Sequence, residues 1–474
     1  MRILYVASEA TPFCASGGLG DVMGSLPTAV ADLCDGYEVG VILPLYHSVR
    51  EKYREALNRR TAFSFYLSWR HVPCTVYEIE KDGVSYFFVD NPYYFQRDSM
   101  YGLFDDGERF AYFSRAVIEF ILRDEFCPDI LHANDWQSAL SVVYLHLMKA
   151  EIPRFSCIKT IFTIHNIEYQ GCYHKDILCD VFGIDTKDAP RLEFDGFINL
   201  LKAAAVTADA VTTVSPSYAE ELRDPAVAFG LHPITQMLGP RLTGIINGID
   251  SVYFDPEGDE ISYPYGISNA IEGKAKNKCA LQKRLSLPID AGIPLAIMVT
   301  RLTESKGIDL VLRAFDALMD HKMQIVILGS GEKRYEWELS SLCQRYGERA
   351  RCIIGFDRQL SKEMYAAADV FLMPSKTEPC GLAQMIACRY GAIPIVHAVG
   401  GLRDSIVPYG CEGGNGFVFY EYGADQLISS VREALALYRD PSKWEGLIKS
   451  AMETDFSWSA SAEGYKLLYR KILS

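Results

Sequence analysis

Short apolar runs rich in β-branched and aromatic residues alternate with longer amphipathic segments along the first half of the chain. Six of these runs read as strands, and they cover residues 2–8, 38–44, 84–90, 129–135, 159–165 and 210–215. Amphipathic segments lie between several of them, such as residues 107–126. Strands that alternate with helices in this way predict βαβ units and a parallel sheet.

The same pattern restarts in the second half of the chain. A second set of strand-like runs covers residues 293–300, 323–329, 351–356, 370–375 and 393–398. Helical patterns separate them, as at residues 306–318 and 361–369. The chain of 474 residues is long enough for two domains, so the sequence predicts an α/β protein with two doubly wound, Rossmann-like parallel sheets in tandem.

A stretch rich in glycine, proline and aspartate marks the best candidate for a linker. It covers residues 247–266, after the first set of strands and before the second. We therefore expect an N-terminal domain over residues 1–245 and a C-terminal domain over residues 251–455. The last stretch, residues 455–474, starts like a capped helix.

The net charge narrows the class of ligand. A value of -14 argues against nucleic acid or an anionic membrane as the main partner, and it is compatible with a neutral ligand such as a sugar polymer. An anionic ligand would need a local basic site built against this general field.

The sequence also predicts where the protein works. Its first apolar run is too short for a signal peptide, and no stretch approaches the ~20 apolar residues of a membrane span. The thirteen cysteines are scattered, with no C-x-x-C pair and no close histidine at zinc spacing. We expect most of them to be buried thiols in a reducing cytoplasm.

A glycine pair follows the first predicted strand, in "SGGLGD", and a helical pattern over residues 21–33 comes next. Gly17 and Gly18 would allow the backbone to come close to a ligand, and the amides at the start of the helix would favour an anion. A plain tight turn explains the same residues. The motif is not the G-x-G-x-x-G dinucleotide fingerprint, which weakens any hydride-transfer reading.

Chemistry-bearing residues follow several other strands. His132 and His165 stand at strand ends in "HANDWQSA" and "TIHNIEYQG", where each could equally be a satisfied core histidine. Arg301 and Lys306 flank a turn in "VTRLTESKGID" and suit a diphosphate, although a solvated helix start is the alternative. Glu378, in "MPSKTEPCGL", precedes a helix and could simply cap it. Ligands of open α/β sheets bind at such strand ends, so we expect a site in the cleft between the two sheets.

Taken together, the order and spacing of "SGGLGD", "HANDW", "TIHNIEYQG", "INGID", "RLTESKG", "PSKTEPCGL" and "GGLRD" closely resemble the bacterial glycogen synthase and plant starch synthase family. The match runs along essentially the whole chain, including "DNPYYF" at 90–95 and "DFSW" at 455–458. The resemblance implies a GT-B fold, with two Rossmann-like domains facing across a deep cleft, and a C-terminal helix over 456–474 that crosses back to the first domain. It also implies no metal and no other cofactor, and the sequence contains no Asp-x-Asp motif.

The resemblance further implies a glycosyltransferase. The family moves glucose from a nucleotide diphosphate glucose, usually ADP-glucose, to the non-reducing end of an α-1,4-glucan with retention of configuration. Whether this chain prefers ADP-glucose or UDP-glucose stays open. Two alternatives also stay open: a related GT-B transferase with another donor or acceptor, and a catalytically weakened glucan-binding relative.

Carried over by motif position, the family assigns roles to particular residues. The catalytic set is Asp135, His165, Arg301, Lys306 and Glu378. The donor-binding set is Ser16, Gly17, Gly18, Asn247, Arg301, Lys306, Glu378, Cys380, Gly381 and Leu382. In these assignments the glycine loop faces the diphosphate and the reacting sugar, and Asp135 and His165 line the sugar site. Asn247 lies on the hinge side, the two cations hold the leaving diphosphate, and Glu378 with the amides after Cys380 holds the sugar hydroxyls.

The sequence departs from the family pattern at three places. Ala15 stands where the family typically has a lysine that faces the donor phosphates. "VHAV" replaces the common Val-Arg-Glu-Thr before the last Gly-Gly-Leu, which puts His397 at the arginine position as either a substitute cation or a buried strand end. "SKT" replaces Ser-Arg-Phe or Ser-Arg-Tyr before Glu378. The loss of the lysine puts donor affinity in doubt.

Overall fold

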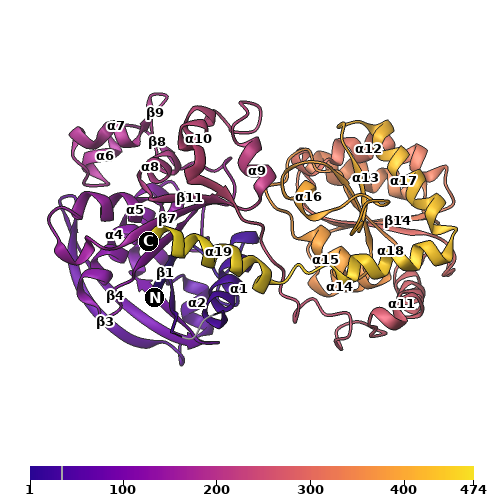
Figure 1. Cartoon of the computed structure of the whole chain (residues 1–474), viewed down its shortest axis with the longest axis horizontal. Helices are drawn as coiled ribbons and strands as arrows, with labels where there is room; N and C mark the ends of the chain where they lie inside the picture. Colours follow the sequence, from indigo (N-terminus) through magenta and orange to yellow (C-terminus); the bar gives the residue numbers. More distant parts are fainter. Residues whose placement is uncertain (34–35) are drawn as a thin grey trace. The chain divides into compact units, whose positions relative to one another are not determined.

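The computed structural model describes residues 1–33 and 36–474, which fold as two units (Figure 1). Unit 1 consists of Met1–Gly248 together with Trp458–Ser474, and unit 2 consists of Ile249–Ser457. The chain thus leaves unit 1 just after Asn247 and returns to it for its last helix. The sequence pattern had set the corresponding boundaries at 245/251 and 455/456.

Unit 1 is built on a nine-stranded sheet whose central strands are parallel. In sheet order the strands are β12 (Leu242–Gly244), β11 (Ala210–Thr213), β7 (Lys159–Ile164), β6 (Ile130–Asn134), β1 (Arg2–Val6), β2 (Glu38–Pro44), β5 (Val84–Asp90), β4 (Arg70–Lys81) and β3 (Asn58–Leu67). All six strands expected from the sequence are present. Because β1, β6 and β7 are neighbours and parallel, the loops that follow them meet at one edge of the sheet.

The strands β3 and β4 were not predicted. They form an antiparallel hairpin at the edge of the sheet, and β4 also pairs antiparallel with β5 (Figure 1). Their side chains alternate between buried, half-buried and exposed positions, so neither strand shows the continuous apolar run that marks a fully buried strand. The sheet of unit 1 is therefore mixed, not purely parallel. A separate small sheet joins β8 (Cys172–Tyr173), β10 (Phe197–Asn199) and β9 (Glu193–Phe194).

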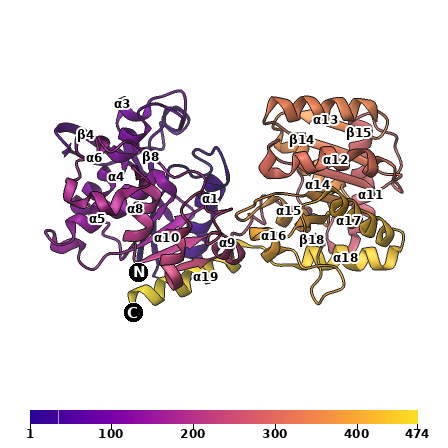
Figure 2. The ribbon, with the colours of Figure 1, turned by 90° about the horizontal axis from the view of Figure 1, so that it is seen from above.

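The helices of unit 1 include the last one of the chain. They are α1 (Gly18–Asp32), α2 (His47–Lys52), α3 (Pro92–Phe95), α4 (Asp106–Arg123), α5 (Asp135–Met148), α6 (Ile177–Asp180), α7 (Ala189–Leu192), α8 (Leu200–Thr207), α9 (Pro216–Glu221), α10 (His232–Leu238) and α19 (Trp458–Leu473). Figures 1 and 2 both show α19 against unit 1, with the two chain ends close together. The buried Tyr469 hydroxyl lies 2.6 Å from that of Tyr5 and 3.0 Å from Nδ1 of His132. His132 is thus a satisfied core histidine that fastens α19 to the central strands.

Unit 2 is built on a six-stranded, fully parallel sheet. Its strands in sheet order are β15 (Ala350–Ile354), β14 (Gln324–Gly329), β13 (Leu295–Val299), β16 (Val370–Met373), β17 (Ile393–His397) and β18 (Phe417–Phe419). Its helices are α11 (Ala270–Arg284), α12 (Ile308–Met319), α13 (Lys333–Arg345), α14 (Arg358–Ala367), α15 (Ala383–Arg389), α16 (Gly400–Ser405), α17 (Ala424–Tyr438) and α18 (Pro441–Glu453). These helices cover both faces of the sheet, as the doubly wound prediction requires (Figure 1). Within the described residues, no helix is long and apolar enough to span a membrane.

Helix α11 brings two lysines into the core of unit 2. Lys274 is only 3% exposed, and its ammonium donates to the carbonyl oxygens of Tyr365, Ala366 and Tyr390. One turn later, Lys278 pairs with the buried carboxylate of Asp369 at 2.5 Å. Burial lowers the pKa of Lys274 to about 7.

The pKa of Lys274 predicts how stability depends on pH. Between pH 7 and about 10.5 the unfolded chain holds a proton on this lysine that the folded chain has partly lost, so the free energy of unfolding should rise with pH. The slope from one such group is at most about 1.4 kcal/mol per pH unit. Lys274→Met should remove it, so the stability of the wild type relative to the variant should increase from pH 7 to pH 9.5 in urea titrations. A constant difference between the two proteins would contradict the lowered pKa.

The cysteines differ from the sequence expectation. All those in the described residues are free thiols, but only Cys14, Cys74, Cys343, Cys380 and Cys388 are buried. The others are half-buried or exposed, because several stand on loops and short edge segments and not on strand or helix faces that point into the core.

Candidate functional site

Three loops of unit 2 interlock at the carboxyl ends of neighbouring strands β13, β16 and β17. Gly307 has φ +74°, and a Cβ there would lie 2.0 Å from the carbonyl oxygen of Pro374. Gly400 has φ +43°, and a Cβ there would lie 2.0 Å from the carbonyl oxygen of Glu378. The amide of Lys376 also donates to the carbonyl oxygen of Ser305 at 2.9 Å. Glycine is needed at both positions because the loops pack backbone against backbone.

Lys306 and Glu378 meet where these loops join. The ammonium of Lys306 lies 2.6 Å from Oε2 of Glu378, and the hydroxyl of Ser375 donates to the same oxygen at 3.1 Å. The carboxylate is almost fully buried, while the lysine side chain keeps 16% of its surface exposed. The sequence placed both residues in the site with separate roles, and the structure joins them as one ion pair between residues 72 positions apart.

The other unit 2 candidates lie on the same loops. Arg301 is exposed, and its guanidinium forms no ion pair within the part of the chain that the structure describes. Cys380 is buried, and Gly381 has φ +72° just before α15. In the described ranges, the amides of Gly381 and Leu382 have no hydrogen-bond acceptor. The loops after β13 and β16 therefore present a cation and two amides that are available to a ligand.

His397 lies behind this loop cluster. Its ring is buried against Phe419 and Tyr422, with centroid distances of 5.3 and 5.4 Å. Nδ1 donates to the carbonyl oxygen of Ser375 at 2.8 Å. These contacts support the buried strand-end interpretation over that of a substitute cation, and they show His397 holding the segment that carries Ser375 and Glu378.

In unit 1, two of the candidate residues stand at the ends of β6 and β7. Asp135 begins α5 with φ +56°, and its Oδ1 accepts the backbone amide of His165 at 2.7 Å. The Nε2 of His165 donates to Oδ1 of Asn134 at 3.0 Å, since an amide oxygen can only accept. The Nδ1 lone pair of His165 is then left as an acceptor.

Burial sets the charge state of both residues. It lowers the pKa of His165 to about 3, so the imidazole is neutral at neutral pH. It raises the pKa of Asp135 to about 7, against the opposing effect of the amide hydrogen bonds from His165 and Asn166. The arrangement makes Asp135 a carboxyl group that orients the His165 loop.

The glycine loop lies beside them, after β1. A Cβ on Gly17 or Gly18 would meet nothing within 4 Å, whereas one on Gly20 would lie 2.5 Å from the Cβ of Ala15. Gly20 is thus required by packing, and Gly17 and Gly18 are not required by any contact inside the described chain. Their open surface fits the expectation that a ligand approaches here.

The sequence interpretation of this loop needs one correction. We expected its amides to reach a substrate, but the amides of Ser16 and Gly17 both bind the carboxylate of Glu9. The hydroxyl of Ser16 donates to the same carboxylate at 3.2 Å. At the start of α1 the amide of Gly20 donates to the carbonyl oxygen of Gly17 at 3.1 Å, so within the described residues the amides of Gly18 and Leu19 remain for a ligand.

Asn247 is buried at the end of the first part of unit 1. Within the described residues its Oδ1 has no hydrogen-bond partner, which is unusual for a buried amide oxygen. An unused acceptor at a residue from the donor-binding set is consistent with a ligand contact.

Sequence reasoning missed three residues that shape the two loop clusters: Glu9, Asn134 and Ser375. Asn134 and Ser375 lie inside quoted motifs, and Glu9 lies seven residues before Ser16 of another, but the role of each depends on which amide or carboxylate it meets in space. The one available signal was position, since all three follow apolar strands at the carboxyl edge of a sheet.

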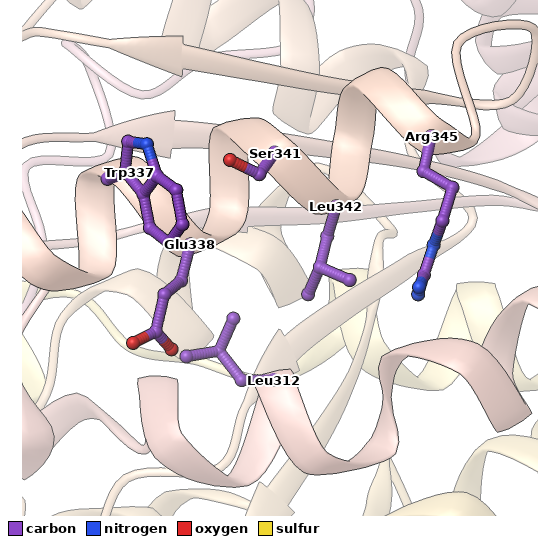
Figure 3. Close-up of a pocket in the computed structure, with 6 residues that line it drawn as sticks. All are labelled: Leu312, Trp337, Glu338, Ser341, Leu342 and Arg345. Carbon is purple, nitrogen blue, oxygen red and sulfur yellow. The ribbon is translucent and has the colours of Figure 1, made fainter.

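A separate groove of about 350 Å³ lies on helix surfaces of unit 2, away from the strand ends (Figure 3). Trp337, Glu338, Ser341, Leu342 and Arg345 of α13 line it together with Leu312 of α12. Its charged residues pair with their own neighbours, Glu338 with Arg334 and Arg345 with Asp316. The groove contains none of the candidate residues.

Comparisons with known proteins agree with this picture. The model of the starch synthase catalytic domain matches residues 2–237, and the model of glycosyl transferases group 1 matches residues 282–449. A glycogen synthase of Lactobacillus acidophilus is 44% identical to this chain, with full coverage of both sequences. A glycogen synthase of Exiguobacterium sibiricum is 42% identical and covers 100% of this chain and 99% of its own.

Solved structures give the same answer. The catalytic domain of starch synthase IV from Arabidopsis thaliana, bound to ADP and acarbose, matches with a TM-score of 0.90 and 32% identity. The match covers 100% of this chain and 99% of that one. A sucrose-phosphate synthase of Thermosynechococcus elongatus is 17% identical with a TM-score of 0.60, a likeness of fold alone. The chain therefore belongs to the glycogen and starch synthase family of glycosyltransferases and has its two-domain GT-B fold.

Proposed function

We propose that this protein transfers glucose from ADP-glucose to the non-reducing end of an α-1,4-glucan with retention of the anomeric configuration. The observation that carries the proposal is the Lys306–Glu378 pair, at the junction of three strand-end loops that also hold the exposed Arg301. In an acidic chain, two cations on one short loop form the local basic site that a diphosphate requires.

The solved relative supports the ligand classes. The Arabidopsis starch synthase IV structure contains ADP, a nucleoside diphosphate, and acarbose, an oligosaccharide. Its similarity extends over the full length of this chain. We take ADP-glucose as the donor and a glucan as the acceptor on that basis.

The residues divide the chemistry as follows. The diphosphate gains negative charge as the glycosidic bond breaks, and Arg301 and Lys306 stabilise that charge most strongly in the transition state. Glu378 fixes the ammonium of Lys306 and, with the free amides of Gly381 and Leu382, binds sugar hydroxyls. The neutral His165 offers Nδ1 as an acceptor to the sugar, in an orientation set by Asn134 and Asp135. The departing phosphate can take the proton of the acceptor hydroxyl on the same face, which retains the configuration.

A donor panel tests the proposal. ADP-glucose and UDP-glucose are supplied with and without glycogen, and the release of nucleoside diphosphate and the anomeric signal of the product are followed. We expect glycogen-dependent ADP release and α-linked product. Release of UDP alone, transfer to a small glycoside alone, or binding of glycogen without any release would each contradict the proposal and favour a different transferase or a glucan-binding relative.

Ala15→Lys should improve donor binding. Ala15 is exposed on the glycine loop, so a longer side chain can extend into solvent from this position. A single partly desolvated charge contact to a donor phosphate corresponds to about one to two kcal/mol, so the donor KM should fall roughly five- to thirtyfold with a smaller change in kcat. The gain should shrink as salt rises. An unchanged or higher KM for both donors would show that this loop takes no part in phosphate binding.

A further inference from the structure

Glu9 is the most deeply buried carboxylate next to the open glycine loop. It is 4% exposed, and it accepts hydrogen bonds from the amides of Ser16 and Gly17 and from the Ser16 hydroxyl. The Tyr101 hydroxyl lies beside the same carboxylate and donates to Ser8 at 2.8 Å. No cation pairs with Glu9 in the described residues, so its partners are hydrogen-bond donors alone.

The contacts of Glu9 explain why the glycine loop holds its shape. Residues 15–18 are exposed, and a Cβ added to Gly17 or Gly18 would meet no other atom within 4 Å. Two adjacent glycines would give such a segment many conformations, because glycine has few backbone restrictions. Hydrogen bonds from two backbone amides to one buried carboxylate favour a single conformation of the loop. Hydrogen bonds to a charged acceptor are stronger than those between neutral groups.

Asp135 does the same work for a neighbouring loop. Its carboxylate accepts hydrogen bonds from the amides of His165 and Asn166, and the nearby charge of Glu9 contributes to the raised pKa of Asp135. In each of the two loops of unit 1 that carry candidate residues, two successive backbone amides thus donate hydrogen bonds to one carboxylate.

We propose that Glu9 is a positioning residue for donor binding: by holding the amides of Ser16 and Gly17, it sets the direction of the free amides at the start of α1. The inference rests on the proposed function, because it assumes that this loop meets the nucleotide sugar. Glu9 itself touches no substrate, and it acts through the backbone of residues 16–18.

The test compares Glu9→Gln with Glu119→Gln. Glu119 is equally buried in the same unit, but its partners are Arg115 and Arg123 of its own helix, far from the glycine loop in sequence. A glutamine at position 9 keeps the shape but loses the charge, and an NH2 group, which can only donate, replaces one of the two oxygens that accept from Ser16. Glu9→Asp serves as the second variant, since it keeps the charge but is too short to reach both amides.

Two measurements on the full chain decide the matter. Hydrogen–deuterium exchange of the ligand-free protein, resolved to residues 16 and 17, should speed up about tenfold or more in Glu9→Gln and stay unchanged in Glu119→Gln. Donor KM should rise about tenfold in Glu9→Gln with a change in kcat below threefold, while thermal stability stays near that of Glu119→Gln.

Each outcome has a distinct meaning. If exchange at residues 16 and 17 is unchanged in both Glu9 variants, Glu9 does not hold the glycine loop, whether or not the enzyme uses ADP-glucose. Faster exchange with an unchanged donor KM would overturn the positioning role. If the wild type turns over no nucleotide sugar, the proposed function fails, and the exchange data still decide whether Glu9 holds the loop.

Discussion

Lys306→Ala should lower kcat by about thirty- to a thousandfold. The substitution removes a preorganised positive charge from the place where the leaving diphosphate gains negative charge, a loss of about two to four kcal/mol of transition-state stabilisation. It also removes the cation that pairs with the buried carboxylate of Glu378, which then keeps only the hydrogen bond from the Ser375 hydroxyl. We therefore expect lower thermal stability as well, and kcat is measured from ADP release at saturating donor, below the unfolding temperature of the variant.

The structure offers a matched control variant, Lys376→Ala, and a second test variant, Arg301→Ala, that breaks no internal ion pair within the described chain. Lys376 forms an exposed pair with Glu304 between the same two loops, so Lys376→Ala removes a cation nearby without touching a buried group. Exposed pairs contribute little, so its kcat should stay within about twofold of the wild type. Arg301→Ala should lose as much rate as Lys306→Ala with no loss of stability, since Arg301 has no internal ion pair in the described chain. Near-normal turnover in both Arg301→Ala and Lys306→Ala would refute the diphosphate role.

Glu378→Gln should lower kcat by about a hundredfold or more while leaving the fold intact. Glutamine has nearly the same shape and can still accept from the Ser375 hydroxyl through its amide oxygen. The charge that holds the Lys306 ammonium in place is lost, so the cation is free to move and the sugar loses a strong acceptor.

The same variant distinguishes a structural role of Glu378 from a role in the reaction. If the carboxylate serves only to hold the start of α15, the melting temperature should drop by several degrees and kcat should hardly change. If the carboxylate serves the reaction, kcat should drop strongly and the melting temperature should hardly change. Calorimetry and single-turnover kinetics on one preparation of Glu378→Gln give both numbers, and a pronounced drop in melting temperature at normal kcat would rule out the reactive role.

The sequence predicted the buried part of the fold well and its edges poorly. Strands with a continuous apolar run, such as β2 at Glu38–Pro44 and β5 at Val84–Asp90, were found at their observed bounds. The hairpin of β3 and β4 was missed, because strands with one face toward solvent mix arginine, glutamate and lysine into the pattern. Helix α1 begins at Gly18, three residues before the expected start, since the glycine pair itself leads into the helix.

For the site, residue types could be predicted but pairings could not. The motifs pointed to Lys306 and Glu378, yet only the adjacency of β13 and β16 shows that they bind each other. The glycine loop was expected to offer its amides, and the structure gives two of them to Glu9, a residue that directly follows the first apolar run of the sequence. A hydrogen bond depends on distance and direction, and neither is visible in spacing along the chain.

Helix α19 closes the core of unit 1 with residues from the very end of the chain, and this affects the order of events during synthesis. Unit 2 is one continuous segment, Ile249–Ser457, and can complete its fold as soon as that segment has left the ribosome. Unit 1 is translated first, but it cannot complete its core until α19 has been made, because the hydroxyl of Tyr5 pairs with that of Tyr469. A released chain that stopped at residue 457 would contain all of unit 2 but would lack α19, so unit 1, the part that was translated first, would stay incomplete and exposed to chaperones and proteases.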